Sequence, residues 1–278
     1  ELSFDTSVDI VQELELIINS GKHWMDISKG PLSCLKTAED PASGKYYLLI
    51  QQHHIMIDHV GLEKIVKEIM QYESEGASGL TLPVLYRDFV AHTLYQQSTN
   101  DSETYFRSRL ETIEEPTFPF GLSDTRGDGS SIQESSIVLP DSLSQQLRSV
   151  SRRFHISPAV LFHAAYGVMI GRCSNKEYAV FGSLFSGRLQ GSLGADESLG
   201  LFINTLPVVL RLEGSVMSYV TQVKKELQGL LPYEQTSLSH IQHWSGIPND
   251  MPLFSALLNY RHSAFSTEGS DSNSDITL

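Results

Sequence analysis

The chain has 278 residues, of which 40% are hydrophobic, enough for one large domain or two lobes with a substantial core. It carries 20 Lys and Arg against 33 Asp and Glu, a formal net charge of −13, which argues against binding to nucleic acid. The sequence has neither a signal peptide at its start nor an apolar run long enough to cross a bilayer, so we expect no membrane contact.

The first half of the chain alternates between helical and strand-like hydrophobic spacing. Two apolar runs, 32–36 and 45–51, lie on either side of a turn-rich stretch and predict an antiparallel hairpin. Apolar residues at helical spacing, with capping residues before them, predict the remaining elements. These helices cover residues 8–18, 84–95 and 102–113, and a further one begins near Val60 or Gly61.

Residues 116–131 are rich in proline, glycine and small polar residues, which is typical of a linker between lobes. We therefore divide the chain into an N-terminal lobe of residues 1–115 and a C-terminal lobe of residues 132–278. The polar stretch 263–275 is expected to be mobile. In the C-terminal lobe, the same spacing rules predict helices at 142–154, 157–172, 216–231 and 238–244, and strands at 132–139, 178–184, 204–212 and 253–260.

The most informative stretch follows the second predicted strand of the hairpin. The strand delivers two adjacent histidines, His53 and His54, and an aspartate, Asp58, stands four residues after the second one. Ionisable groups held at the end of a buried strand are where chemistry tends to occur. Adjacent histidines can bind metal, but no second His or Cys cluster supplies the four ligands of a closed zinc site, so we predict no metal.

This block, His-His-x-x-x-Asp followed by small residues, resembles the core motif of the condensation domains of nonribosomal peptide synthetases. Four further features of that family follow in the right order: two of its motifs, a degenerate form of a third, and a stretch like the one that comes after its last motif. They are Tyr86, Asp88 and Phe89; Gly200, Phe202, Asn204 and Thr205; Tyr233, Glu234 and Gln235; and Pro252, Leu253 and Phe254. His59 stands where the family has glycine, and the family's first two motifs have no counterpart here.

The resemblance implies an α+β fold of two chloramphenicol-acetyltransferase-like sandwich lobes, here incomplete at both ends, with the active site in a tunnel between them. It also implies an acyltransferase-type reaction that forms a peptide bond between a carrier-bound acyl or peptidyl thioester donor and a carrier-bound aminoacyl acceptor. We expect the 278-residue piece alone to have weak activity or none.

The candidate catalytic residues are His54, His53 and Asp58. A neutral imidazole can accept the proton that the acceptor amine loses, or orient that amine by a hydrogen bond; we assign this role to His54 without choosing between the two. We expect His53 to hold the end of the strand. In the family, the aspartate pairs with an arginine that belongs to the missing segment, so Asp58 either lacks a partner here or uses a local one.

The candidate substrate-binding residues are His59, Gly61, Ser186, Arg188, Asn204 and Thr205. A side chain at His59 is expected to narrow the acceptor channel, with either a change of acceptor choice or a loss of activity as the result. Asn204 and Thr205 either contact substrate or form a polar pair at a strand edge. Arg188 either lies near the tunnel or is a solvated surface charge.

The resemblance implies no directly bound cofactor, because the substrates arrive on phosphopantetheine arms. The implied partners are the upstream and downstream peptidyl carrier domains and an adjacent adenylation domain. Cys34 and Cys173 lie far apart, which favours a reducing compartment over a disulfide scaffold, and we expect a cytoplasmic protein.

Other functions of related domains stay open. Epimerising relatives usually differ around the motif at Phe202 to Thr205, and heterocyclising relatives replace histidines with aspartates. A terminal cyclising domain remains an alternative, as does a fragment that acts only as a scaffold.

Overall fold

The computed structural model describes residues 9–19, 25–40, 43–125, 127, 132–188 and 194–261, and the predicted mobile stretch 263–275 lies outside them. The chain forms two compact units. Unit 1 contains Glu1–Val84 and Glu197–Phe202, and unit 2 contains Leu85–Asp196 and Ile203–Leu278.

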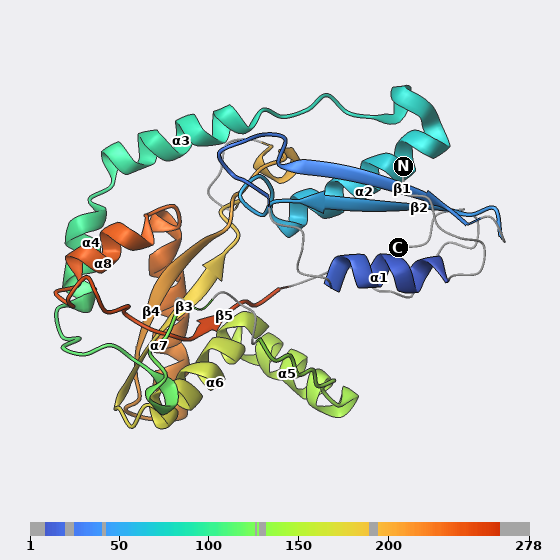
Figure 1. Ribbon diagram of the computed structural model, residues 1–278. Coiled ribbons are helices and arrows are strands. Elements are labelled where there is room, and N and C mark those ends of the chain that lie inside the picture. The colour runs from blue at the N-terminus through green and yellow to red at the C-terminus, as the bar shows by residue number, and fades with distance from the viewer. Residues whose placement is uncertain are drawn as a thin grey trace. The chain divides into compact units, whose positions relative to one another are not determined.

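Unit 1 is built on a β-hairpin. Strands β1 (Ser33–Glu39) and β2 (Tyr46–Gln52) pair antiparallel, which confirms the predicted hairpin. Helix α1 (Ile10–Asn19) lies along the hairpin and buries Ile10 and Leu14 against Ala38 (Figure 1). The helix predicted near Val60 is α2 (His59–Glu75), and a 3₁₀ turn, η1 (Gly76–Gly79), follows it.

Unit 2 is built on a three-stranded sheet in the order β4-β3-β5 (Figure 1). Central strand β3 (Tyr178–Phe185) pairs antiparallel with β4 (Asn204–Arg211) and parallel with β5 (Leu257–Leu258). The other elements of this unit are α3 (Tyr86–Thr99), α4 (Ser102–Leu110), η2 (Pro119–Gly121), α5 (Asp141–Phe154), α6 (Pro158–Cys173), α7 (Val216–Leu230), η4 (Leu231–Tyr233) and α8 (Leu238–Trp244), and the 3₁₀ turn η3 (Ala195–Glu197) spans the boundary between the units.

The core of unit 2 lies where α6 and α7 pack on β3 and β4. The strands are buried on both faces, and Phe181, Leu206 and Val208 are 0% exposed. Glycine allows α6 to approach closely, because a Cβ on Gly167 would lie 2.6 Å from a methyl group of Leu210. Helix α6 buries Val160, Ala164 and Ile170 in this core, whereas its residues Val168 and Met169 are 42% and 49% exposed.

Two strand predictions in unit 2 are wrong in whole or in part. Residues 132–139 form no strand, and Ile137 and Val138 are 89% and 91% exposed. Alternating hydrophobicity yields a strand only where a partner supplies the backbone hydrogen bonds, and the described residues offer none to this segment. Of the predicted strand 253–260, only Leu257–Leu258 pairs as a strand.

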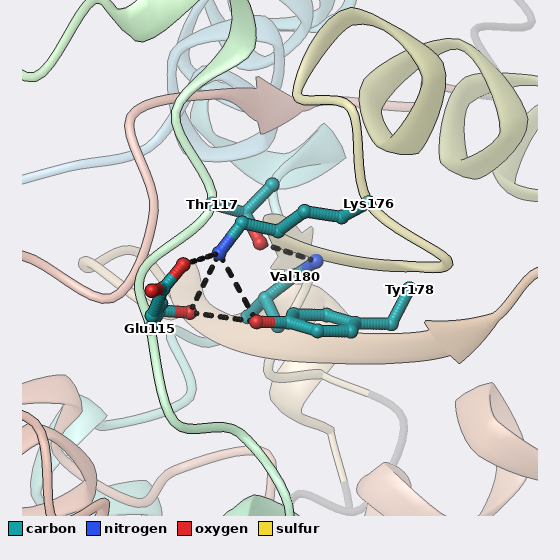
Figure 2. A network of polar contacts seen from close by, with 5 residues as sticks. All are labelled: Glu115, Thr117, Lys176, Tyr178 and Val180. Atoms are coloured by element: carbon teal, nitrogen blue, oxygen red, sulfur yellow. Dashed lines mark hydrogen bonds and ion pairs between the residues drawn. The ribbon is translucent and has the colours of Figure 1, made fainter.

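The start of the predicted linker is fixed to the sheet of unit 2. Lys176 Nζ lies 3.0 Å from a carboxylate oxygen of Glu115, and Tyr178 donates its hydroxyl to the Glu115 carbonyl at 3.1 Å; Figure 2 shows both contacts. Thr117, which is 0% exposed, accepts the Val180 N–H at 3.2 Å. The compact units separate between Val84 and Leu85 instead, so the lobe boundaries at residues 115 and 132 stay a prediction.

A buried carboxylate closes the open edge of β4. Glu226 of α7 is 2% exposed, accepts the backbone N–H of Val209 at 3.2 Å, and forms an ion pair with Arg109 of α4. An unpaired edge N–H invites another strand to pair, and Glu226 occupies it. The same carboxylate therefore joins α4, α7 and β4.

Arg109→Met is expected to destabilise the protein by about 3–5 kcal/mol, because it leaves the Glu226 carboxylate buried without its cation. Urea unfolding measures the loss. The matched control is Arg107→Met, which removes an exposed ion pair with Glu103 and should cost no more than about 1 kcal/mol. Equal losses in the two variants would contradict the role of Glu226.

A buried histidine couples α6 to β3. His163 is 5% exposed, with Nδ1 2.7 Å from the Ala159 carbonyl and Nε2 2.7 Å from the Ser183 hydroxyl. Since a carbonyl only accepts, Nδ1 carries the proton and Nε2 accepts the Ser183 O–H. Burial lowers the pKa of His163 below its ordinary value of 6.5.

Stability should therefore fall as the pH drops below 6.5, because the unfolded chain binds a proton there that folded His163 does not. The loss continues down to the lowered pKa of the folded state, with a slope of at most about 1.4 kcal/mol per pH unit. Urea unfolding between pH 7.5 and 5 should show a shallower slope for His163→Gln. His243→Gln, which changes an exposed histidine in α8, should keep the wild-type slope. Equal slopes for all three proteins would contradict this account.

Candidate functional site

The turn between β2 and α2 is fixed at its first end by His53. The His53 N–H donates to the Leu32 carbonyl at 3.0 Å, and the His53 carbonyl accepts the Met56 N–H at 3.0 Å. The ring nitrogen Nδ1 accepts the Ile55 N–H at 3.1 Å. In its neutral form this ring therefore carries its proton on Nε2.

His54, the next residue, has a different environment. Its side chain is exposed, and its ring makes no hydrogen bond to any residue that the structure describes. Both ring nitrogens can therefore meet a group from outside. Imidazole is the side chain best suited to exchange protons near neutral pH, so this ring can act as a base or as a hydrogen-bonding group.

The second end of the turn is fixed by Asp58, which is 1% exposed. One carboxylate oxygen caps α2 by accepting the Gly61 N–H at 2.9 Å, and the other accepts the Phe202 N–H at 3.2 Å. The Asp58 N–H donates to the Gly200 carbonyl at 3.2 Å. Asp58 therefore accepts hydrogen bonds from two backbone N–H groups, at positions 61 and 202, and the expectation about its arginine partner stays a prediction.

These contacts attach residues 197–202, called the strap below, to the rest of unit 1. Ser198 forms a parallel bridge with Val84, and Glu197 forms an ion pair with Lys64 of α2. The Lys64 ammonium lowers the pKa of Glu197, chiefly through this hydrogen bond. Asp58, Lys64 and Val84 thus hold the strap within unit 1, and Asp58 also fixes the second end of the turn.

Gly61 and His59 lie in the first turn of α2. Gly61 is buried, and a Cβ there would lie 2.5 Å from a carbon of Ile57, so close packing requires glycine. His59 is the first residue of α2 and is partly exposed. Substrate contacts for both residues stay predictions.

The remaining candidates lie in unit 2, at one end of the β3–β4 pair. Phe185, the last residue of β3, is paired with Asn204, and Ser186 follows it as an exposed residue. The Asn204 amide donates both its hydrogens, to the Glu234 and Thr236 carbonyls at 2.8 Å each. Thr205, partly exposed, is opposite Leu184.

Arg188 is not a solvated surface charge, which corrects one of its two interpretations. It is 7% exposed, and its guanidinium donates to the Ala195 carbonyl at 2.6 Å. The arginine therefore holds the chain just before the strap. A tunnel contact for Arg188 stays a prediction.

The sequence did not predict three residues that hold the strap: Lys64, Glu197 and Ser198. Lys64 is 133 positions away from Glu197, so no local pattern joins the lysine to the strap. Within the described residues, no group of three or more His, Cys, Asp or Glu side chains could hold a metal ion. None of the described helices can span a membrane alone, although α5 and α6, bent by 108°, together have the length and composition.

The sequence comparisons agree on one protein family. A family model described as Condensation domain matches residues 5–277. Malpibaldin synthetase from Mortierella alpina is 36% identical over 280 residues, which cover 100% of this chain and 5% of that protein. Malpinin synthetase from the same organism is 34% identical over 270 residues, 96% of this chain and 4% of its own length.

Solved structures agree on the fold. A four-domain nonribosomal peptide synthetase in its holo form, bound to AMP and glycine, aligns with a TM-score of 0.72 at 18% identity, over 94% of this chain and 20% of that one. The first condensation domain of the calcium-dependent antibiotic synthetase, in complex with a substrate analogue, aligns with a TM-score of 0.66 at 16% identity, over 93% and 58%. These matches confirm the predicted α+β fold class.

Asp58→Ala should destabilise the protein by about 2–4 kcal/mol, because it removes a helix cap and leaves two buried N–H groups without acceptors. Urea unfolding tests this. Asp101→Ala is the matched control, since Asp101 caps α4 by accepting the Thr104 N–H but is exposed, and its loss should cost about 1 kcal/mol. The role of Asp58 is contradicted if its substitution costs no more than that of Asp101.

Proposed function

We propose a function from one premise: this chain belongs to the condensation domain family of nonribosomal peptide synthetases. In this proposal the chain joins a carrier-bound acyl or peptidyl thioester to the amine of a carrier-bound aminoacyl acceptor. Domains of this family are acyltransferase-type, peptide-bond-forming enzymes. The observation that carries the proposal for this chain is the exposed His54 imidazole, set on a turn whose two ends are fixed by His53 and Asp58.

A neutral acceptor amine loses one proton when it becomes the amide nitrogen, and an acceptor that arrives as ammonium must lose another proton first. An α-amino group has a pKa of about 8, so part of the acceptor is ammonium at neutral pH and must be deprotonated before it attacks. The free amine then adds to the thioester carbonyl, the C–N bond forms, the C–S bond breaks, and the pantetheine thiol leaves with a proton. His54 accepts the proton from the nitrogen, or holds the amine in line by a hydrogen bond.

His53 and Asp58 act through the backbone in this proposal. His53 uses its ring nitrogen to hold the turn, and Asp58 uses both carboxylate oxygens on backbone N–H groups, so neither needs to touch substrate. This agrees with a positioning role for both and speaks against Asp58 as a member of a catalytic triad.

The candidate substrate-binding residues differ in how many of their polar atoms are available to a ligand. Ser186 is exposed and can meet a ligand, whereas the Asn204 amide nitrogen is fully used by two carbonyls. Only the Asn204 side-chain oxygen is left to accept a hydrogen bond. We retain Thr205, Arg188, His59 and Gly61 as candidates, with Gly61 contributing through its lack of a side chain.

The partners we propose are peptidyl carrier domains on both sides and an adjacent adenylation domain. A related structure is a four-domain synthetase, and the chain spans only 5% and 4% of the length of the two curated relatives described above. Phosphopantetheine is then the tether of the substrates on the carriers and not a group held by this chain. Cys34 and Cys173 are free thiols, which agrees with a cytoplasmic location.

His54→Ala should lower the rate of dipeptidyl product formation about 10²–10⁴-fold, because the group that handles the amine proton is lost. The assay uses the module that contains the chain, with loaded donor and acceptor carriers. Carrier binding and the melting temperature should stay at the wild-type values.

His243→Ala, an exposed histidine of α8, is the control and should retain full activity. Unchanged product formation by His54→Ala would contradict the catalytic role of His54 and would favour the scaffold alternative.

A further inference from the structure

The strap is attached to unit 1 at two separate places. Its C-terminal part is held by Asp58, through the Gly200 carbonyl and the Phe202 N–H. Its N-terminal part is held by the Ser198–Val84 bridge and by the ion pair between Glu197 and Lys64. Two side chains that lie close together along the sequence, Asp58 and Lys64, thus fasten opposite ends of the strap.

The Lys64 side chain is largely buried in its ion pair with Glu197. Its side chain is 16% exposed, whereas that of Glu197 is 62% exposed, so the ion pair is covered mainly on the lysine side. Glu68, one turn along α2, lies 3.7 Å from the same ammonium, and Lys67 also lowers the pKa of Glu197. A charged group buried to this degree is retained at a cost unless a partner offsets it, and Glu197 supplies that partner.

The strap has a direct route to the reacting group. Movement of residues 200–202 changes the acceptors and donors around Asp58, and Asp58 fixes the second end of the turn that carries His54. The His54 ring has no hydrogen-bond partner among the described residues, so the backbone of the turn sets its position. A small displacement of a catalytic group lowers a rate without weakening substrate binding.

We propose that Lys64 is a positioning residue, which fastens the strap to α2 through Glu197 and thereby holds the Asp58 end of the turn that presents His54. This inference rests on the proposed function for its effect on rate, but its structural part stands alone. Lys64 touches no substrate in this account and acts through Glu197, the strap and Asp58 in that order.

The test combines kinetics with backbone amide hydrogen exchange. Lys64→Met should lower kcat by about 3- to 10-fold with the KM values for both carriers unchanged, a size that fits a partly buried ion pair. Exchange of the Phe202 amide, measured on the same protein, should speed up by at least the same factor. Lys64→Arg keeps the positive charge and should restore most of both properties.

A double-mutant cycle tests the route through Glu197. Glu197→Gln should reproduce the effects of Lys64→Met, and the double variant should be no worse than either single one. The matched control is Lys29→Met, which removes the exposed Lys29–Asp26 ion pair in the same unit and should change neither kcat nor Phe202 exchange.

Each outcome decides something. Unchanged Phe202 exchange in Lys64→Met overturns the proposal whatever the activity, and faster exchange with unchanged kcat overturns the positioning role. Additive losses in the double variant overturn the route through Glu197. If His54→Ala keeps full activity, the proposed function fails, while the exchange results still report on the Lys64–Glu197 attachment of the strap.

Discussion

The carboxylate of Asp58 is the constraint on which the rest of this site depends. It is almost completely buried, and it satisfies two backbone N–H groups that lie 141 positions apart in the chain, those of Gly61 and Phe202. A buried carboxylate is tolerated only when hydrogen bonds replace its water. These two hydrogen bonds to Asp58 therefore join the start of α2 to the strap.

This arrangement separates the two tasks of the histidine motif. His53 and Asp58 fix the backbone of the turn from either end, and both use their polar atoms on neighbouring backbone groups. His54 is left exposed and able to meet an incoming amine. A general base or positioning group works best when it stands on a rigid support and its own nitrogen atoms take part in no structural hydrogen bond. The turn presents His54 in this way.

Local sequence patterns predicted most helices and strands. The features that depend on contacts between distant residues were not predicted. Helical spacing located α5, α6, α7 and α8, and two apolar runs on either side of a turn-rich stretch located the β1–β2 hairpin, because those signals lie close together in the sequence. Residues 132–139 alternate as a strand does, yet no described partner pairs with them. For the site, the motif placed His53, His54 and Asp58 correctly on one turn, but Lys64 and Glu197 carry no pattern that links them across 133 positions.

The measurement that tests the central claim most directly uses Asp58→Asn, which keeps the size of the side chain but replaces an acceptor with a donor. Phe202 amide exchange and the single-turnover rate of condensation are measured on the same preparation with loaded carriers. We expect the Phe202 amide in the strap to exchange faster and the condensation rate to fall together with it. A released strap with a wild-type rate would contradict the claim that Asp58 holds the reacting histidine in place.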